Sequence, residues 1–381
     1  KILLNRVEVL KELKIYKTEI NDELELNFSN LNSVNLSSSY LKNNLNTNIS
    51  VIDATFAHSI ESVVNKLKKV NPEVLGIYVD GLMTLDAIAI ADWAKDNRLF
   101  TIFGGPQATV LPEYFIAHAD MVVRGEGELI LTHIIKSFGM HDLSHIPGIW
   151  WKKNGEIIKN APNQNFIDLD SIPFPRRDLF PMDKYLYNWN YLDAVGTNKS
   201  GTTMMVSRGC PFSCSYCQPT IREMFGSKLR LRSSGNVVEE IKMLKKQYKI
   251  DGIFFHDDTF TVDNAWLNEF CETLENDDLS ILWGCNSRID TVNEAILKRM
   301  YNVGLRSIHF GIESGSQRIL DSIYNKKIKL EQVKDVISLT RKIGIHTMGF
   351  FMLGAPSETG EEINNTIAFA KSLRLEEASF S

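Results

Sequence analysis

Three cysteines occupy one short segment of the chain. Cys210, Cys214 and Cys217 follow the spacing C-x3-C-x2-C, and thiolates are soft ligands that suit iron–sulfur clusters or zinc. A four-iron cluster held by three cysteines keeps one iron without a protein ligand, and chemistry can occur there. A structural zinc ion needs a fourth ligand, which only a distant residue such as His256 or Cys285 could supply. The spacing therefore favours an iron–sulfur cluster over a zinc ion or a chance group of free thiols.

The placement of the cysteines supports an intracellular metal site. The chain has five cysteines and none before Cys210, whereas a secreted disulfide framework would spread an even number along a small chain. Cys271 is expected in a helix and Cys285 near the end of a strand. For both we favour packing in a core.

Composition and charge set wide bounds. The 381 residues are 44% hydrophobic and 23% charged, as in an ordinary globular protein of two or three domains. The net charge of −5 gives no sign of nucleic-acid binding. The densest basic stretch, 228–232, alternates with leucine and predicts a strand edge or a local anion contact. No apolar run approaches the ~18 residues of a membrane span, and no signal peptide opens the chain. We therefore expect a cytoplasmic protein without a transmembrane segment.

The cysteine loop follows the first strand of a regular β/α alternation. Apolar periodicity predicts strands at 203–208, 251–256, 280–287, 305–312, 345–353 and 375–381. Helices are expected between them at 234–248, 263–275, 291–302, 315–322, 330–342 and 360–373. The chain stops after this sixth strand, so we expect that a C-terminal region is absent.

An earlier alternation precedes these units. Strands are predicted at 49–53, 73–79, 99–103 and 120–124, and helices at 58–70, 84–97, 111–118 and 128–138. This order implies a doubly wound parallel sheet, whose ligands bind at the carboxyl ends of the strands. Glycine loops at 104–106 and 125–128 lie at such ends.

The connection between the two alternations has its own signals. Asn154-Gly155 predicts a β-hairpin, because both residues tolerate positive φ, and a proline-rich stretch follows it. We expect one domain at 1–148, a hairpin and linker at 149–200, and a second domain at 201–381. An aromatic patch before the second domain should pack between the domains or, as a second reading, line a substrate site: Tyr185, Tyr187, Trp189 and Tyr191.

The cysteine loop resembles the signature of radical S-adenosylmethionine (SAM) enzymes. In that family C-x3-C-x2-C, with an aromatic residue before the third cysteine as at Tyr216, follows the first strand of a β/α barrel. The resemblance covers residues 203–381, because further segments match in order at the ends of successive strands. It implies a partial (β/α)6 TIM-like barrel that holds a [4Fe-4S] cluster and SAM.

The same resemblance implies SAM contacts at strand ends, where barrel active sites lie. Asp257 and Asp258 would hold the SAM ammonium, since carboxylates suit that cation. Ser287 and Arg288 would meet the SAM carboxylate. Each segment alone is also compatible with a turn or a helix N-cap. The remaining SAM contacts implied are Tyr216, Glu313, Ser314, Met352 and Gly354.

Residues 1–148 resemble the cobalamin-binding domain of B12-dependent radical SAM enzymes, which is a Rossmann-like doubly wound fold. The matching segments are 51–54, 73–80, 104–108 and 124–128, with a similar linker at 168–175. Glycines at the strand ends let the backbone approach the corrin and its nucleotide tail. The cobalamin contacts that this implies are Asp80, Gly81, Gly104, Gly105, Pro106, Gln107, Gly125, Glu126 and Gly127.

Two further features refine the resemblance. Methylthiotransferases carry three more cysteines in their N-terminal domain, and this chain has none there. The motif D-x-H-x-x-G, which supplies a histidine ligand to cobalt in several B12 proteins, is also missing. The expectation is therefore a cobalamin domain that binds cobalt without histidine, with residues 1–48 matching poorly.

The resemblance implies a mechanism. A reduced cluster would cleave SAM to a 5′-deoxyadenosyl radical, which takes hydrogen from an unactivated substrate carbon, and methylcobalamin would then supply a methyl group. The expected function is a B12-dependent radical SAM C-methyltransferase acting on a small molecule or a peptide. An electron donor such as flavodoxin or ferredoxin would serve it. An oxidoreductase that cyclises or rearranges its substrate, and a non-catalytic iron–sulfur or zinc module, are the alternatives. No separate catalytic residue stands out.

Overall fold

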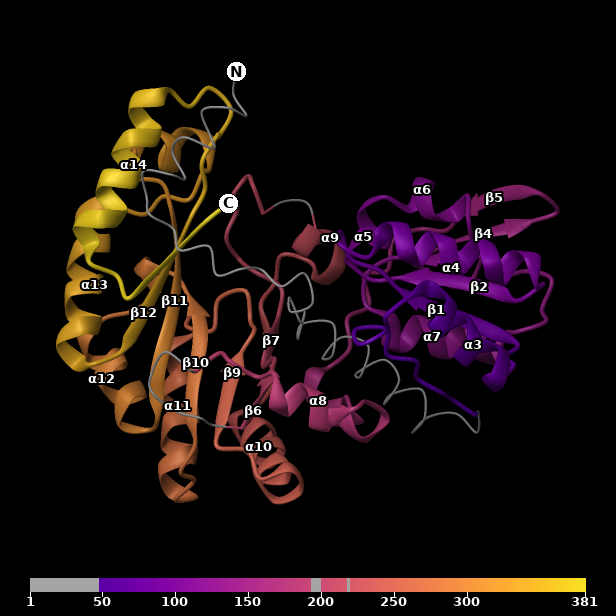
Figure 1. Cartoon of the computed structure of the whole chain (residues 1–381), viewed down its shortest axis with the longest axis horizontal. Coiled ribbons are helices and arrows are strands. Elements are labelled where there is room, and N and C mark those ends of the chain that lie inside the picture. The colour runs from indigo at the N-terminus through magenta and orange to yellow at the C-terminus, as the bar shows by residue number, and fades with distance from the viewer. Residues whose placement is uncertain (1–47, 193–199, 218–219) are drawn as a thin grey trace.

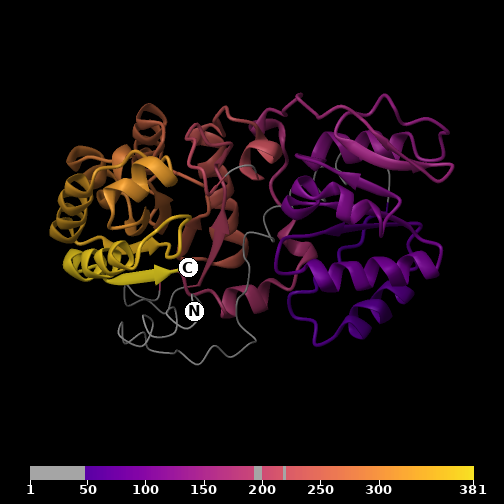
Figure 2. The ribbon, with the colours of Figure 1, turned by 90° about the horizontal axis from the view of Figure 1, so that it is seen from above.

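The computed structural model describes residues 48–192, 200–217 and 220–381. Two lobes lie side by side, an N-terminal sheet lobe and a larger barrel lobe (Figures 1 and 2). None of the helices in these described ranges combines the length and the apolar character needed to span a bilayer. Both lobes are α/β, which confirms the expected doubly wound domain followed by a partial barrel.

The N-terminal lobe is built on one five-stranded sheet. Its strands, in spatial order, are β1 (Val74–Tyr78), β2 (Phe100–Gly104), β3 (Met121–Val123), β4 (Ile149–Lys153) and β5 (Glu156–Lys159). The first three are parallel, and β4 and β5 form an antiparallel hairpin. Asn154 and Gly155 both have positive φ at its turn, as predicted. The hairpin continues the N-terminal sheet and is not a free linker.

Helices cover both faces of this sheet. They are α3 (Ile60–Val70), α4 (Thr84–Asp96), α5 (Pro106–Val110), α6 (Pro112–Ile116) and α7 (Gly127–Lys136). One apolar cluster joins α4, α5 and α6 to one face, and a second joins α7 to the other. The predicted helix at 111–118 is wrong in its bounds, because Pro106 and Pro112 each begin a short helix of their own.

The predicted strand at 49–53 is also wrong. This segment pairs with no strand among the described residues. Asp53, the last residue of this segment, is bonded through its side chain. Its carboxylate accepts hydrogen bonds from Thr55 N at 2.9 Å and from the Tyr185 hydroxyl at 2.8 Å. A tertiary contact to the connecting segment therefore holds this stretch in place of a ladder.

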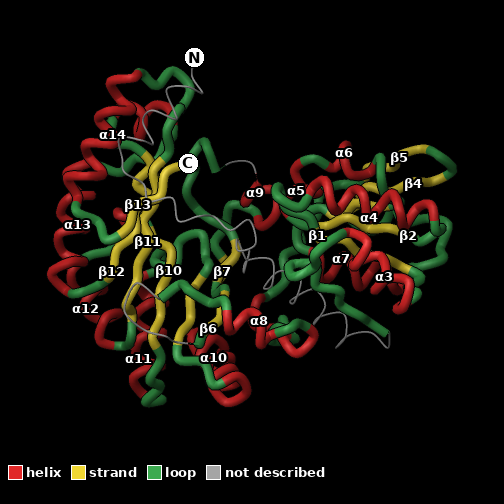
Figure 3. Tube along the Cα trace, viewed as in Figure 1, coloured by secondary structure: helices red, strands yellow, loops and turns green. Residues whose placement is uncertain are grey.

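The barrel lobe has six parallel strands in sequential order. They are β6 (Gly201–Met204), β9 (Gly252–Phe255), β10 (Leu282–Ser287), β11 (Leu305–Glu313), β12 (His346–Phe351) and β13 (Glu377–Phe380). Helices lie outside them (Figure 3): α10 (Ser234–Tyr248), α11 (Asn264–Asn276), α12 (Glu294–Asn302), α13 (Leu330–Ile343) and α14 (Gly360–Leu373). β6 and β13 are the two edges, so the barrel is partial, as expected.

The first predicted barrel strand, 203–208, is interrupted. After β6 the chain turns and forms β7 (Ser207–Arg208), which pairs antiparallel with β8 (Arg230–Leu231). The cause is Asp257, whose Oδ1 accepts hydrogen bonds from the backbone N–H groups of Val206 at 2.9 Å and Ser207 at 2.6 Å. These two donors cannot then serve the parallel ladder. In addition, the helix predicted at 315–322 contains a π-helical turn at Ile319–Ile323.

Aromatic residues close the amino end of the barrel. Trp189 lies after α8 (Met182–Tyr187) and packs where β6 and β9 begin, since a Cβ added at Gly201 or Gly252 would stand 2.5 Å from its ring. Tyr191 stacks on Phe254 with ring centroids 4.8 Å apart. The aromatic patch therefore serves mainly in packing, and its exposed member is Tyr187.

Candidate active site

The cysteine loop leaves β7 at the carboxyl end of the barrel, and its middle is tied to the loop after β11. The backbone N–H of Ser215 donates to the Tyr324 carbonyl at 2.9 Å. The Asn325 side chain donates to the carbonyl and to the hydroxyl of Ser213, both at 3.0 Å. These bonds fix the loop without using a thiol, so the cysteines stay available as ligands.

The three thiols form one electrostatic group. None is in a disulfide, Cys214 is buried, and Cys210 and Cys217 are half-buried. Burial, with the negative charges of Asp258 and the two other cysteines, raises the pKa of Cys217 to about 11. In the described residues no three Cys, His, Asp or Glu side chains surround one metal-ion position. Three thiols on one short loop are the donor type that binds an iron–sulfur cluster.

Arg288 lies against the cysteine loop. Its Nη1 donates to Cys214 Sγ at 3.2 Å, and its guanidinium stacks on Phe212 at 3.8 Å. Its remaining directions are used by a two-pronged bond to Asp290 at 2.9 Å and a bond to the Lys326 carbonyl, also at 2.9 Å. The side chain was predicted to meet the SAM carboxylate. In the structure its guanidinium is directed towards Cys214 and Asp290, which leaves it few donors for another ligand.

Glu313 belongs to a polar triad in which Glu313 and Lys326 are buried and Tyr216 is partly exposed. Its Oε1 accepts from the Tyr216 hydroxyl at 2.9 Å and from Lys326 Nζ at 3.0 Å, and Lys326 is 2.8 Å from the same hydroxyl. The backbone of Glu313 is strained, with φ at +71°. A Cβ at Gly311 would press against the Glu313 carboxylate and Lys326 Nζ, so the triad packs closely against this backbone. The structure thus brings two predicted SAM residues together with Lys326.

The two aspartates after β9 have different surroundings. Asp257 is fully buried and holds the β6–β7 turn, and its Oδ2 has no hydrogen-bond partner among the described residues. Asp258 keeps accessible surface at the carboxyl end of the barrel. Burial raises the pKa of the Asp257 carboxyl to about 6. Asp258 also acts electrostatically on Cys210 and Cys217, so it is the one of the pair that faces the cysteine loop.

The other predicted SAM residues are mostly engaged by the protein. The Ser287 hydroxyl is 2.6 Å from that of Thr261, and the Ser314 hydroxyl is 3.1 Å from that of Thr366. Met352 pairs through its backbone with Glu313. Each serine hydroxyl therefore has one protein partner and keeps further hydrogen-bonding capacity.

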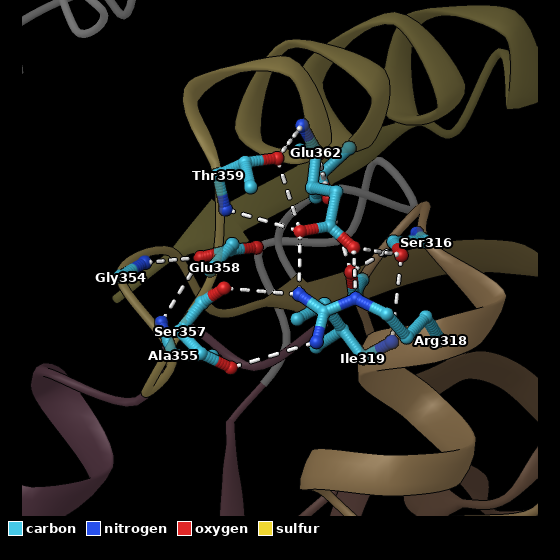
Figure 4. A network of polar contacts seen from close by, with 11 residues as sticks. Ser316, Arg318, Ile319, Gly354, Ala355, Ser357, Glu358, Thr359 and Glu362 are labelled. Atoms are coloured by element: carbon cyan, nitrogen blue, oxygen red, sulfur yellow. Dashed lines mark hydrogen bonds and ion pairs between the residues drawn. The ribbon is translucent and has the colours of Figure 1, made fainter.

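Glu358 and Glu362 hold the loop after β12 in place (Figure 4). The Glu358 carboxylate accepts from Gly354 N at 2.6 Å and from Ala355 N at 3.0 Å, and Gly354 has φ at +86°. Glu362 receives two bonds from Arg318, at 2.8 and 2.6 Å. The loop that carries Gly354, one of the expected SAM contacts, is thus shaped by side chains at the start of α14.

A cavity of ≈ 970 Å³ lies between the two lobes. It is lined by the β1 and β2 backbones and by the glycine loops after β2 and β3, and it reaches the barrel at 205–208. A Cβ at Gly76 or Gly104, both in its wall, would meet open space. These bare backbones form a cradle for a flat ligand, which fits a corrin or its nucleotide tail.

The predicted cobalamin residues divide between this cavity and its surroundings. Gly104, Gly105, Gly125, Glu126 and Gly127 line it. The others lie outside its lining. Asp80 Oδ1 accepts from Leu82 N at 3.0 Å and from Met83 N at 3.2 Å, and a Cβ at Gly81 would be 3.8 Å from the Gln107 side chain. Pro106 begins α5.

Several residues of the site had no signal in the sequence. Lys326, Asp290 and Glu358 are in none of the matched segments. Lys326 bonds to Glu313 across 13 residues, whereas Asp290 and Glu358 bond to Arg288 and Gly354, two and four residues away. Arg208 and Glu128 flank motifs that the sequence did identify. They form a buried ion pair, with Arg208 Nη2 at 2.7 Å from Glu128 Oε1. Charge complementarity of the two flanks was the one available hint.

Comparison with known proteins gives matches to both lobes. Residues 204–370 match the radical SAM superfamily and residues 32–135 match the B12 binding domain. An uncharacterized methyltransferase of Pyrococcus horikoshii is 36% identical over 86% of this chain and 70% of its own length. The anaerobic magnesium-protoporphyrin IX monomethyl ester cyclase of Rubrivivax gelatinosus is 29% identical over 87% and 60%. The cytidylyl-2-hydroxyethylphosphonate methyltransferase of Streptomyces wedmorensis is 26% identical over 84% and 66%.

Solved structures share the fold of both lobes together. TsrM of Kitasatospora setae, a radical SAM methyltransferase with cobalamin and a [4Fe-4S] cluster bound, superposes with a TM-score of 0.73 over 92% of this chain and 68% of its own. OxsB, a cobalamin-dependent SAM radical enzyme, gives 0.73 over 89% and 49%. Identities are 18% and 20%. On the similarity to the Pyrococcus methyltransferase and the two domain matches, the chain belongs to the cobalamin-dependent radical SAM enzymes.

Proposed function

We propose that this chain transfers a methyl group to an unactivated carbon of a small molecule or a peptide. The observation that carries the proposal is the cavity between the lobes, since its wall joins the glycine loops of the N-terminal sheet to residues 205–208, just before the cysteine loop. When bound, the cluster would supply the electron that cleaves SAM, and cobalamin would supply the methyl group. A methyl-transfer reaction needs both groups next to one substrate.

Different residues of the chain would bind the cluster, SAM and cobalamin. Cys210, Cys214 and Cys217 would hold the cluster, and the exposed carboxylate of Asp258 suits the ammonium of SAM. The triad of Glu313, Tyr216 and Lys326 offers charged and polar atoms beside the cysteine loop. The bare backbones at Gly76 and Gly104 would accept the corrin or its tail. Enclosure between the lobes would keep water and oxygen from the reacting atoms.

Support for methyl transfer over other outcomes comes from the relatives. Two of the three curated relatives above are named methyltransferases, and TsrM has been solved with tryptophan as its substrate. The third is named a cyclase, which keeps an oxidative cyclisation as the second candidate. We also propose that a small reducing protein such as flavodoxin or ferredoxin supplies electrons in the cytoplasm.

The test is an anaerobic reaction of the full chain, loaded with iron, sulfide and cobalamin. SAM carrying a deuterated methyl group is added together with a metabolite extract and a reductant, and products are read by mass spectrometry. A product that gains the deuterated methyl group supports the proposal. A product that loses hydrogens and gains no label would replace methyl transfer by the cyclase-type reaction. A preparation that binds zinc and no iron would remove the enzyme reading.

A further inference from the structure

We propose that the segment Arg124–Glu128, expected to serve only as a cobalamin loop, is a positioning element that locks the N-terminal lobe onto the flank of the cysteine loop. The inference rests on the proposed function, because it assigns the segment the task of setting the spacing between cobalt and cluster. Arg208 is two residues before Cys210, and Glu126 stands between the two glycines of the cavity wall. One set of contacts therefore joins the two candidate cofactor sites.

The centre of the contact is a buried group of four charges. Arg208 lies 3.1 Å from Glu126 and 2.7 Å from Glu128, and Arg230 forms a further ion pair with Glu126. All four side chains are at most 16% exposed. Burial alone would raise the pKa of Glu128, but the charge of Arg208 and its hydrogen bond outweigh it, and the net shift is downward. The pair is therefore ionised at neutral pH.

Contacts around these charges extend the same interface. Arg124 Nη2 donates to Glu223 Oε2 at 2.9 Å, and Glu223 belongs to α9 (Thr220–Phe225), the helix that follows the cysteine loop. A Cβ at Gly125 would stand 3.3 Å from the Met224 carbonyl, so the two backbones nearly touch. The Arg208 guanidinium lies 5.6 Å from the centre of the Phe225 ring. The segment 124–128 thus contacts residues on both sides of the cysteine loop, Arg208 before it and α9 after it.

An interface of buried ion pairs opposes a shift of one lobe relative to the other. If the lobes shifted by a few ångström, buried carboxylates and guanidiniums would lose their partners, and an unpaired buried charge is strongly unfavourable. Apolar surfaces tolerate small shifts, whereas charge pairs and bidentate contacts require one geometry. The contact therefore favours a single orientation of the lobes. A reaction between groups on two cofactors needs this, since a misplacement of about 1 Å can cost about 10²-fold in rate.

The experiment uses the loaded full chain with the reduced cluster and cob(II)alamin, two paramagnetic centres. Pulsed electron paramagnetic resonance measures the distribution of distances between them. We expect one narrow distribution in the wild type and a clearly broader or shifted one in Glu128→Gln and in Arg124→Glu. The charge-swapped pair Arg124→Glu with Glu223→Arg should return the narrow distribution. Lys298→Glu, at an exposed pair with Glu294 on α12, is the matched control and should change nothing.

A second readout needs no cofactor. Amide hydrogen exchange of 124–128 and 220–225 in the cofactor-free chain should speed up in Arg124→Glu and return to the wild-type rate in the swapped pair, which also excludes simple misfolding. Unchanged exchange and distances in the single variants would overturn the inference. A wild type that binds no cobalamin would overturn the proposed function instead, and the exchange experiment would still decide whether the contact exists.

Discussion

At the scale of single residues, the chemistry of a side chain was easier to predict than its direction. Arg288 was placed correctly at the end of a barrel strand, but its guanidinium turns to Cys214 and Asp290. Asp257 and Asp258 are adjacent and of one type, yet one supports a turn and the other stays accessible. The direction of the Arg288 side chain follows from its partners. Asp290 is two residues away, whereas Cys214 and the Lys326 carbonyl are 74 and 38 residues away and give no local signal.

Arg288 should tune the cluster. In Arg288→Gln the cysteine sulfur loses a charged donor, so the reduced, more negative cluster is stabilised less. We expect the reduction potential to fall by about 59 mV, which is a tenfold change in a one-electron equilibrium. Redox titration followed by electron paramagnetic resonance measures it. Arg306→Gln is the control, since Arg306 stacks on Tyr301. An unchanged potential at full iron content would refute the role.

Substitution of Asp258 should weaken SAM binding more than substitution of Asp257. Asp258→Asn removes a carboxylate from the accessible end of the barrel, and losing one charge-assisted bond of about 1.5–3 kcal/mol should weaken SAM binding at least about tenfold. Asp257→Asn retains an oxygen that can accept from Val206 and Ser207 and should leave SAM affinity within about threefold. Isothermal titration with the cluster-loaded chain measures both. Equal losses in the two variants would contradict the assignment.

At the scale of elements, helices and buried strands follow from periodicity and caps, whereas interruptions do not. α14 begins at a complete capping box between Thr359 and Glu362, and its start agrees with the prediction. The 203–208 and 49–53 segments have the apolar pattern of strands. Each is diverted by a carboxylate, Asp257 in one case and Asp53 in the other. A sequence pattern cannot show such bonds, because their partners are 50 or 132 residues away.

The capping box should have a measurable effect on stability. Thr359→Ala removes the acceptor for the backbone N–H of Glu362 and one contact of the Glu362 carboxylate. We expect a loss of about 0.5–2 kcal/mol in the free energy of unfolding. Chemical denaturation measures it. Thr359→Ser should keep the wild-type value, and a serine variant as unstable as the alanine variant would show that the cap is not the cause.

At the scale of the whole molecule, the sequence predicted two α/β lobes and did not predict how they meet. The helices and strands of each lobe follow from local sequence patterns. Their junction depends on pairs that are distant in the chain, such as Arg208 with Glu128, and Arg177 with Glu240 at 2.7 Å. The second pair docks the connecting segment onto α10 and is almost completely buried. Arg177 and Glu240 also belong to the lining of the cavity between the lobes.

Acid should loosen the docking of the connecting segment. Burial would raise the pKa of Glu240, but Arg232 and Arg177 outweigh it, and the pKa is lowered in the folded chain. A carboxyl with a depressed folded pKa stabilises the fold above its unfolded pKa, near 4.3, and this contribution is lost as the pH falls through the folded value. We expect the free energy of unfolding to decline below about pH 4.5.

The variant Glu240→Gln measures how much the ionised Glu240 carboxylate contributes to the free energy of unfolding. Removing one partner of a buried pair should cost about 3–5 kcal/mol at pH 7, and the acid-dependent decline should become shallower in the variant. Denaturation curves at several pH values measure both effects. Glu294→Gln, in an exposed pair, serves as the control. A variant with wild-type stability at pH 7 would contradict the role of this pair.

If one chain carries both a SAM-cleaving cluster and a cobalamin methyl carrier, it should form two products from SAM. The chain is reconstituted anaerobically to about four irons, saturated with cobalamin, and given SAM and a reductant. We expect both 5′-deoxyadenosine and S-adenosylhomocysteine. In Cys210→Ala the first product should disappear while cobalamin stays bound. A fully loaded wild-type chain that forms neither product would show that the two cofactors do not act in this chain.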